Sequence, residues 1–420
     1  MTSEVLMLNK DAVVIAADSA VTTGRAPHPR YSKAANKIFD LSVHGNVALT
    51  IYGNADVDRV PWELAVKLFR AADAKNNSRA KLHDYQTALL GFLQGNSGIF
   101  PAAVRDSLLQ KRILSAAVHV LGQVAERFPA FVDSSASIPN RQTAWGAGSA
   151  AVAAALGATA LKAPLVSADL VAAQALIPQM QPDLSQELLG DPKYLYVDAG
   201  VLLQLAAETL VKEPENFLTS TGVVIAGYGE DEIFPSFTHL RVFGHIGNSL
   251  FWTAENNYAI THDNEAWIQP FAQSSMIERF TDGFDFSLTA INHRCGLDLI
   301  DAVLGDLATG GVAVPAPLGA TIKTQRHTEF MKDFRQKNWN ENFYPLRRVL
   351  NSLSVPEMGH LAESLLVLEA LRERVTSPSE SVGGPIDVAV VTKAEGLVWL
   401  KRKHYFEPEL NLRYLNRSRI

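Results

Sequence analysis

Thr2 follows the initiator methionine directly, and a threonine in this position can act as a nucleophile. A small second residue normally permits removal of Met1, which would leave Thr2 at the N-terminus. An N-terminal threonine carries its own nucleophile, the γ-hydroxyl, and its own base, the α-amine, whose ordinary pKa is about 7.7–8.0. A nearby lysine cation would lower that pKa and keep more of the amine neutral. Because many proteins simply begin with Met-Thr, the hypothesis needs support from other residues.

The segments that would hold Thr2 in place are predicted strands. Alternating and continuous apolar runs, separated by tight polar turns, predict four short strands in this region, at residues 6–8, 12–17, 37–41 and 47–52. The second of these stops at Asp18, and Gly53 ends the last one. Each of these strand ends therefore places a polar or flexible residue beside a buried run.

Five tracts of the chain resemble the proteasome β-subunit family of N-terminal nucleophile hydrolases, which includes the bacterial HslV-type peptidases. Three lie near the N-terminus (VVIAADSAVTTG, ANKIFDL and VALTIYGNADV), and two lie downstream (VVIAGYGEDEIFPSFTHL and VGGPIDVAVVTKAEGLVWL). The resemblance implies an α+β fold, a four-layer αββα sandwich with two antiparallel sheets between helix layers. It also implies a cofactor-free threonine peptidase that acts on a peptide or protein substrate as a homo-oligomer, with any unfoldase partner unidentified.

The resemblance further implies roles for residues that match the family's motif. Asp18 lies sixteen residues after Thr2, where the family has its catalytic-site aspartate. Lys37 directly precedes Ile38, at the place of the family's catalytic lysine. Gly53 corresponds to the glycine whose backbone N–H stabilises the oxyanion in that family.

Elementary electrostatics favours the same pairing of Lys37 with Asp18. A lysine cation buried beside Thr2 is costly unless an anion pairs with it, and Asp18 at the end of a buried strand is the natural partner. Read singly, Asp18 is a turn-capping aspartate and Lys37 a charge at a strand edge. Lys33 is a rival for the lysine role by residue count, but Lys37 abuts the apolar strand.

The supporting residues of the family's site are less well matched. Ser274 or Ser275 occupies the place of a family serine near the threonine amine, although an ordinary helix N-cap explains either one equally well. The family's aspartate and serine before its Gly-Gly pair are replaced in the segment 379–382 by Ser379 and Val382, and Glu380 or Ser381 would have to substitute. The arginine that follows the family's Asp-Ser is Ala20.

The remaining sequence divides into a split core and two insertions. The β patterns and the amphipathic helix near 355–375 predict one hydrolase domain, with its core in residues 1–70, 219–308 and 346–405. An Ala- and Leu-rich helical block, residues 71–215, forms the large insertion, and an irregular stretch, residues 309–345, forms the smaller one.

Composition excludes several other classes of protein. The chain has 420 residues, 47% of them hydrophobic, and a net charge of −6, which argues against a broad nucleic-acid-binding surface. A single cysteine, Cys295, excludes an intramolecular disulfide framework and predicts a cytoplasmic, reducing compartment. The uncharged stretch 144–161 is mostly Ala and Gly, so we expect a packed helix and no membrane span. The histidines show no metal-ligand spacing, which predicts no metal site.

Three functions remain open at this stage. The first is a threonine peptidase. The second is an N-terminal nucleophile amidase that acts on a small non-peptide amide, with the helical insertion shaping its pocket. The third is a catalytically silent relative used for assembly, which the altered residues before Gly383 favour.

Overall fold

The computed structural model describes the chain except for residues 1, 24–29, 192, 377–382, 405 and 412–420. The predicted substitutes at 379–382 therefore lie outside the described residues.

The first sheet contains five antiparallel strands drawn from three distant parts of the sequence. Their spatial order is β12 (Ala266–Ala272), β1 (Ser3–Asn9), β2 (Ala12–Ala17), β13 (Asp387–Thr392) and β14 (Gly396–Lys401). The β1–β2 hairpin turns where predicted, because Asn9 Oδ1 accepts hydrogen bonds from the backbone N–H groups of Asp11 and Ala12 at 3.0 and 3.1 Å. The strand that starts beside Thr2 is thus paired on both sides.

The second sheet is also five-stranded and antiparallel. Its order is β11 (Ser249–Ala259), β10 (Ser236–Ile246), β9 (Thr221–Gly227), β6 (Val47–Gly53) and β5 (Ile38–Asp40). Two short ribbons lie outside the sheets, β3 (Val21–Thr23) with β4 (Arg30–Ser32) and β7 (Asp56–Val57) with β8 (Val60–Pro61).

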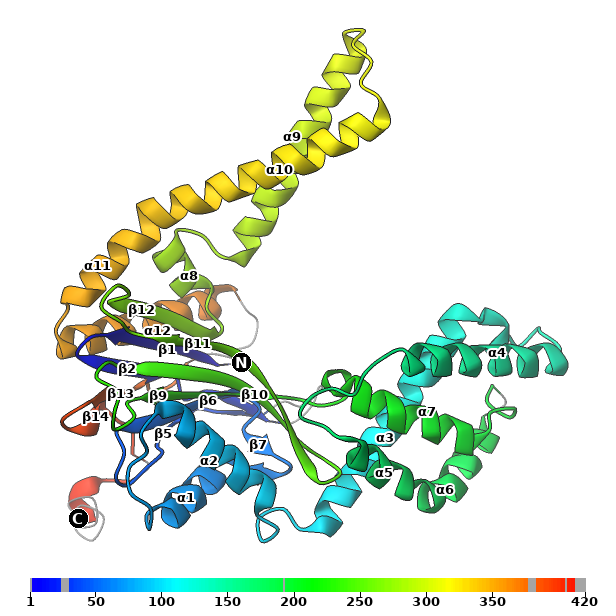
Figure 1. Cartoon of the computed structure of the whole chain (residues 1–420), viewed down its shortest axis with the longest axis horizontal. Helices are drawn as coiled ribbons and strands as arrows, with labels where there is room; N and C mark the ends of the chain where they lie inside the picture. Colours follow the sequence, from blue (N-terminus) through cyan, green and yellow to red (C-terminus); the bar gives the residue numbers. More distant parts are fainter. Residues whose placement is uncertain (1, 24–29, 192, 377–382, 405, 412–420) are drawn as a thin grey trace.

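The two sheets pack face to face, and helices cover both outer faces (Figure 1). An apolar layer that includes Leu6, Ile15, Val224 and Phe237 fills the space between the sheets. The first sheet is covered by α8 (Ser275–Asp282), α11 (Tyr344–Ser352) and α12 (Val355–Thr376), and the second by α1 (Trp62–Asp73) and α2 (Leu82–Gly95). The predicted α+β fold, a four-layer αββα sandwich with two antiparallel sheets between helix layers, is confirmed.

A helical lobe projects from one end of the sandwich (Figure 1). It contains α3 (Ala102–Arg127), α4 (Ile138–Gly157), α5 (Ser167–Ala175), α6 (Ile177–Gly190) and α7 (Ala199–Lys212). These helices share an apolar core of their own, into which Phe243, Ile246 and Phe251 of β10 and β11 insert. The helix α2, which falls inside the predicted insertion 71–215, packs instead on the second sheet.

A long helical hairpin projects from the other end and is called the arm here; it consists of α9 (Phe286–Thr309) and α10 (Ala316–Asn338) (Figure 1). The prediction of an irregular stretch at 309–345 was wrong. Gly310 and Gly311 form the tight turn between the helices, and Pro315 is the N-cap of α10, so the apparent breaks lie only at the helix ends. A single π-helical turn, Trp339–Phe343, returns the chain to α11. Cys295 is exposed on α9.

The stretch 144–161 forms most of α4 in the lobe. Within the described part of the chain, no helix is long and apolar enough to cross a membrane.

Candidate functional site

Thr2 lies immediately before β1, a central strand of the first sheet. Its backbone carbonyl accepts a hydrogen bond from Gln273 N at 2.9 Å, which ties it to the end of β12. The side chain is buried, with 6% of its surface exposed. The backbone around the candidate nucleophile is therefore fixed by the first sheet.

Lys37 extends from the residue before β5 toward Thr2, so the second sheet supplies this cation. Its Nζ atom lies 3.1 Å from Thr2 Oγ1 and 2.5 Å from Asp18 Oδ1, in a site where the lysine is 4% exposed. The Lys37 carbonyl accepts from Ile51 N at 3.1 Å, which holds the lysine backbone against β6. Lys33, the rival by residue count, is exposed.

Asp18 follows β2 and accepts four hydrogen bonds on its carboxylate. Oδ1 accepts from Ser3 N at 3.1 Å and from Lys37, while Oδ2 accepts from Ala20 N at 3.3 Å and Gly383 N at 2.9 Å. Both carboxylate oxygens of Asp18 are therefore hydrogen-bonded within the protein. Gly383 brings the C-terminal segment into the site, a contact that the sequence reading did not predict.

Burial lowers the pKa of Lys37, because the surrounding protein disfavours the charged ammonium. The negative charges of Asp18 and Glu4 oppose this effect and favour the cation. The lysine charge is therefore held by its carboxylate neighbours, which agrees with the electrostatic argument for pairing.

Gly53 ends β6 with φ +82°, a conformation that L side chains rarely adopt. It is exposed, and its ladder partner is Thr221 of β9. This backbone conformation by itself explains a glycine at position 53. The glycine is therefore no separate evidence for the oxyanion role of its N–H, which stays a prediction.

The two candidate serines lie beside the site, but their hydroxyls are bonded elsewhere. Ser274 Oγ donates to Glu278 Oε1 at 2.6 Å, and Ser275 Oγ donates to Glu369 Oε1 at 3.1 Å. Both serines stand at the start of α8, and Ser274 is its N-cap residue. Their connection to Thr2 runs through the backbone of the preceding residue, Gln273.

Glu4 is a site residue that the sequence reading missed. It is 0% exposed, lies two residues after Thr2, and burial raises its pKa to about 8. The signal was present, since Glu4 is a charged residue that directly precedes the apolar run from Val5 to Leu8.

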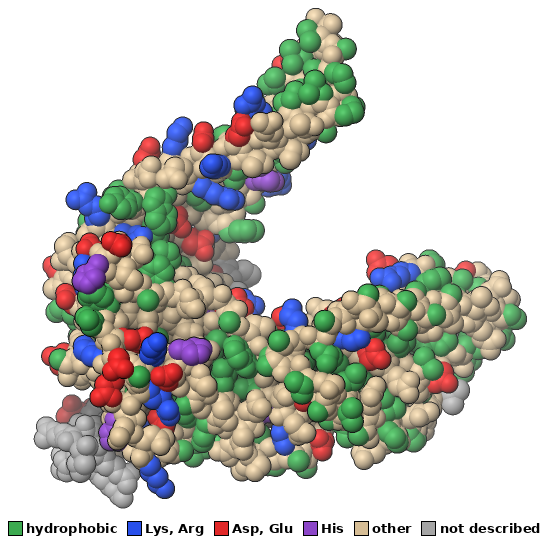
Figure 2. Space-filling view, in the orientation of Figure 1, with side chains coloured by type: hydrophobic (Ala, Val, Ile, Leu, Met, Phe, Trp, Pro, Cys, Tyr) green, Lys and Arg blue, Asp and Glu red, His purple; other side chains and the backbone are tan. Residues whose placement is uncertain are grey.

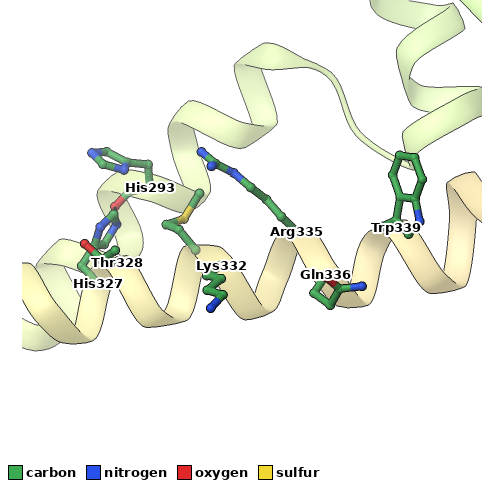
Figure 3. Close-up of a pocket in the computed structure, with 8 residues that line it drawn as sticks. His293, His327, Thr328, Lys332, Arg335, Gln336 and Trp339 are labelled. Atoms are coloured by element: carbon green, nitrogen blue, oxygen red, sulfur yellow. Dashed lines mark hydrogen bonds between the residues drawn. The ribbon is translucent and has the colours of Figure 1, made fainter.

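A separate pocket of about 550 Å³ lies on the arm (Figure 3). It is lined by His293 of α9, by Trp339 of the π-helical turn, and by residues of α10 that include His327 and Arg335. None of its lining residues belongs to the site around Thr2. Among the described residues, no group of three or more His, Cys, Asp or Glu side chains is placed to hold a metal ion.

Comparison with known proteins gives little. No family model matches the chain, and no curated protein matches it. Among solved structures, the chain is similar to an Anbu (Gly-1) mutant from Hyphomicrobium sp. strain MC1, with 9% sequence identity and a TM-score of 0.26, over 100% of this chain and 95% of the other. The assignment to the proteasome β-subunit and HslV family is thereby corrected, because no family model supports it and the solved structure is a differently named protein.

Proposed function

We propose that this chain is a threonine-type N-terminal nucleophile hydrolase that cleaves peptide bonds through an acyl-enzyme on Thr2. The observation that supports this best is the Lys37 ammonium, which lies 3.1 Å from Thr2 Oγ1 while it pairs with Asp18 at 2.5 Å. A buried cation at that distance stabilises negative charge on the hydroxyl oxygen as it loses its proton.

The reaction begins once Met1 has been removed. The Thr2 α-amine accepts the proton of Oγ1, and the oxygen attacks the carbonyl carbon of the substrate amide. The carbon–nitrogen bond then breaks, and the α-ammonium returns the proton to the leaving amine. Water hydrolyses the resulting ester, which releases the carboxylic acid and restores the free threonine.

The backbone N–H of Gly53 is the proposed donor to the oxyanion of the tetrahedral intermediate. One such donor is typically worth about 3 kcal/mol of transition-state stabilisation. Its positive φ frees the N–H direction from the constraint that a side chain would impose.

A substrate longer than a small amide suits the surroundings of the site. Figure 2 shows the molecule hollowed between the arm and the helical lobe, and β1 starts at the edge of this hollow. A broad open approach of this kind accommodates an extended peptide more readily than it encloses a small molecule.

The decisive experiment compares wild type with Thr2→Ala and Thr2→Ser on a library of fluorogenic peptides. We first confirm by intact mass that Met1 is absent. Thr2→Ala is expected to lose hydrolysis, whereas Thr2→Ser keeps a hydroxyl and retains measurable activity. A β-lactone probe is expected to add its mass to the N-terminal peptide of the wild type alone.

Four results would overturn the proposal. If active protein retains Met1, Thr2 has no free amine to act as the base. If Thr2→Ala hydrolyses peptides as well as wild type, Thr2 is not the nucleophile. Hydrolysis of a simple amide such as an acylated aniline, with no peptide cleaved, would favour the small-amide function instead. An unreactive Thr2 in protein that lacks Met1 would favour the silent relative.

We also propose a homo-oligomer, in which a second copy of the chain covers the arm. Among its described residues α9 has none that is buried, and Phe286, Leu299 and Val303 expose 81%, 66% and 51% of their surface. A helical hairpin of this length gains little stability without a packed apolar face.

A further inference from the structure

The pocket on the arm carries positive charge that the arm does not neutralise. Its volume is about 550 Å³, and none of the described residues that line it is acidic. Two of them, Lys332 and Arg335, are exposed cations of α10. Lys323 of the same helix pairs with Asp301 of α9 at 2.5 Å, whereas within the described part of the chain neither Lys332 nor Arg335 has an ion pair or a hydrogen bond. Both cations are therefore available to an anion from outside the molecule.

The pocket is an elongated groove that follows α10. Its lining residues recur on each turn of the helix from His327 to Trp339. At about 1.5 Å per residue this stretch rises about 18 Å, which is the length of about five residues of extended peptide. Figure 3 shows His293 of α9 at one end of this stretch and Trp339 at the other. An open groove of this length fits a short peptide better than a compact small molecule.

Contacts hold both ends of the groove in place. At one end, the rings of His327 and His293 meet edge to face with 4.3 Å between their centroids, and His327 Nε2 donates to the His293 carbonyl at 3.1 Å. At the other end, the Trp339 ring packs on Phe343 with 4.7 Å between centroids, and the Arg347 guanidinium lies 5.7 Å from the Trp339 centroid. Trp339 still exposes 39% of its surface. The groove is therefore formed before a ligand arrives, which lowers the entropic cost of binding.

The spacing of the exposed groups predicts the sequence of the ligand. Lys332 and Arg335 are three residues apart on one helix, so their Cβ atoms are about 5–6 Å apart. In an extended peptide, residues i and i+2 project to the same side about 6.6 Å apart, so two acidic residues with one residue between them match the two cations. Trp339 lies about one turn beyond Arg335 and suits an aromatic side chain two positions further along the peptide.

We propose that this groove binds a short acidic segment of another protein. Two acidic residues of the segment, separated by one residue, pair with Lys332 and Arg335, and an aromatic residue packs on Trp339. The inference is independent of the hydrolase function proposed above, because no lining residue of the groove belongs to the site around Thr2.

Other occupants fit the groove less well. A nucleic acid requires a longer track of cations than two, and the chain has a net charge of −6. A second copy of the chain is assigned above to exposed apolar residues of α9, and Phe286, Leu299 and Val303 do not line the groove. Both occupants are therefore outcomes that the test must separate from an acidic peptide.

The test is the fluorescence anisotropy of labelled peptides mixed with the full-length Thr2→Ala protein, in which the proposed nucleophile is absent. One probe contains Glu-Ala-Glu-Ala-Phe and a second contains the reverse order, since the spacing leaves the direction of the peptide open. We expect saturable binding of at least one probe. Replacing both glutamates by glutamine is expected to weaken that binding at least about fivefold, and added salt is expected to weaken it further. Replacing the phenylalanine by alanine is expected to weaken it about threefold.

Variants of the protein test the same contacts from the other side. Arg335→Gln and Lys332→Gln each remove one cation from the groove and are expected to weaken binding of the acidic probe about fivefold. Both side chains are exposed, so these substitutions leave the fold intact. Lys337→Gln is the matched control, because Lys337 is an exposed cation of the same helix that does not line the groove. This control changes the net charge equally and is expected to bind the probe as the Thr2→Ala protein does.

Several outcomes would overturn the inference. Equal binding of the glutamate and glutamine probes would show that charge is not recognised, and an equal effect of Lys337→Gln and Arg335→Gln would place the binding elsewhere. A change in the number of chains per particle on Arg335→Gln, measured by light scattering, would assign the groove to a second copy. Tighter binding of a ten-nucleotide oligothymidylate than of the acidic probe would assign it to nucleic acid. None of these measurements depends on hydrolysis, so the function proposed for Thr2 stands or falls separately.

Discussion

Lys37 is a nearly buried cation whose charge depends on its carboxylate neighbours. Asp18 would remain well satisfied without the lysine, because three backbone N–H groups also donate to it. Lys37 has no such reserve, since among the described residues its ammonium donates hydrogen bonds to Asp18 and Thr2. The pair is therefore asymmetric, so removing Asp18 and removing Lys37 are expected to have different effects on stability.

This asymmetry predicts that Asp18→Asn costs more stability than Lys37→Met. Asp18→Asn leaves the buried ammonium without its close anion, which is expected to lower the free energy of unfolding by about 3–5 kcal/mol. The double variant removes both charges and is expected to recover most of that stability while hydrolysis stays lost. Urea unfolding at pH 7 measures all three variants. Equal losses for the two single variants, with no recovery in the double, would contradict the asymmetry.

Glu4 makes stability depend on pH in a defined direction. Its pKa is raised to about 8 in the folded state, so the folded chain binds a proton that the unfolded chain has already lost above about pH 4.5. The free energy of unfolding contributed by this group is fully present below about pH 4.5 and falls as the pH rises to about 8. Glu4→Gln removes this dependence. We therefore expect the melting temperature of the variant, relative to wild type, to rise steadily from about pH 5 to about pH 8, as calorimetry would show; a constant difference would contradict the prediction.

Among the elements, α3 connects the helical lobe to the sandwich through one buried polar cluster. Arg112 of α3 pairs with Asp58 at 2.7 Å, and Asp58 Oδ2 accepts from both the backbone N and the ring Nδ1 of His245 at 2.7 Å. Burial alone would raise the pKa of Asp58, but the His245 hydrogen bond and the Arg112 charge outweigh it and hold that pKa below its usual value. Gly244, with φ +114°, makes room for the Asp58 carboxylate, which a Cβ would meet at 2.4 Å.

Breaking this connection is expected to loosen the lobe before the sandwich. Arg112→Met removes a charged partner of a fully buried carboxylate and should cost about 2 kcal/mol. Lys67→Met is the matched control, because the Lys67–Glu63 pair is exposed and such pairs contribute at most about 1 kcal/mol. Limited proteolysis of the Arg112→Met variant should release fragments cut between α2 and α3. Indistinguishable behaviour of the two variants would show that the cluster does not anchor the lobe.

Local patterns predicted most of the sandwich, because its strands are short, apolar and bounded by turns. They missed β12, because its sequence contains Pro270 and a proline argues against a strand. The proline is tolerated there because β12 lies at the edge of the sheet, where a missing N–H breaks no ladder. They also missed α10, the second helix of the arm, because Gly310 and Pro315 read as breaks within a loop although they sit at helix ends. The contacts of Asp18 with Lys37 and Gly383 join segments far apart in the sequence, and only the first was foreseen, from the cost of burying a cation.

At the scale of the molecule, the sandwich is flanked by two projections of different character. The lobe has its own apolar core, whereas the arm exposes apolar side chains along α9 and α10 (Figure 2). The lobe is stabilised by this core, to which β10 and β11 also contribute, whereas the arm depends on a neighbour. The arm is therefore the projection to test for assembly.

Deleting the arm should leave the sandwich folded and reduce assembly. Gly283 lies close to Asn338, since a Cβ on the glycine would stand 3.7 Å from Asn338 Oδ1. A short Gly-Ser linker that replaces residues 284–337 can therefore join these two residues. We expect the shortened chain to retain its cooperative unfolding and the pairing of Lys37 with Asp18. Light scattering should give fewer chains per particle than for the full-length protein. An unchanged number of chains would exclude the arm from the interface.

The hydrogen bond from Gly383 to Asp18 also sets when, during synthesis of the chain, the surroundings of Asp18 can be completed. Chains are synthesised from the N-terminus at about 5–20 residues per second, so about 20–80 s separate the synthesis of Thr2 from that of Gly383. Throughout that interval β2 lacks β13, the neighbour that completes its sheet, and the Asp18 carboxylate lacks one of its donors. A nascent chain on the ribosome thus carries Thr2 without its finished surroundings, and the proposed site is completed only after residue 383 has been made.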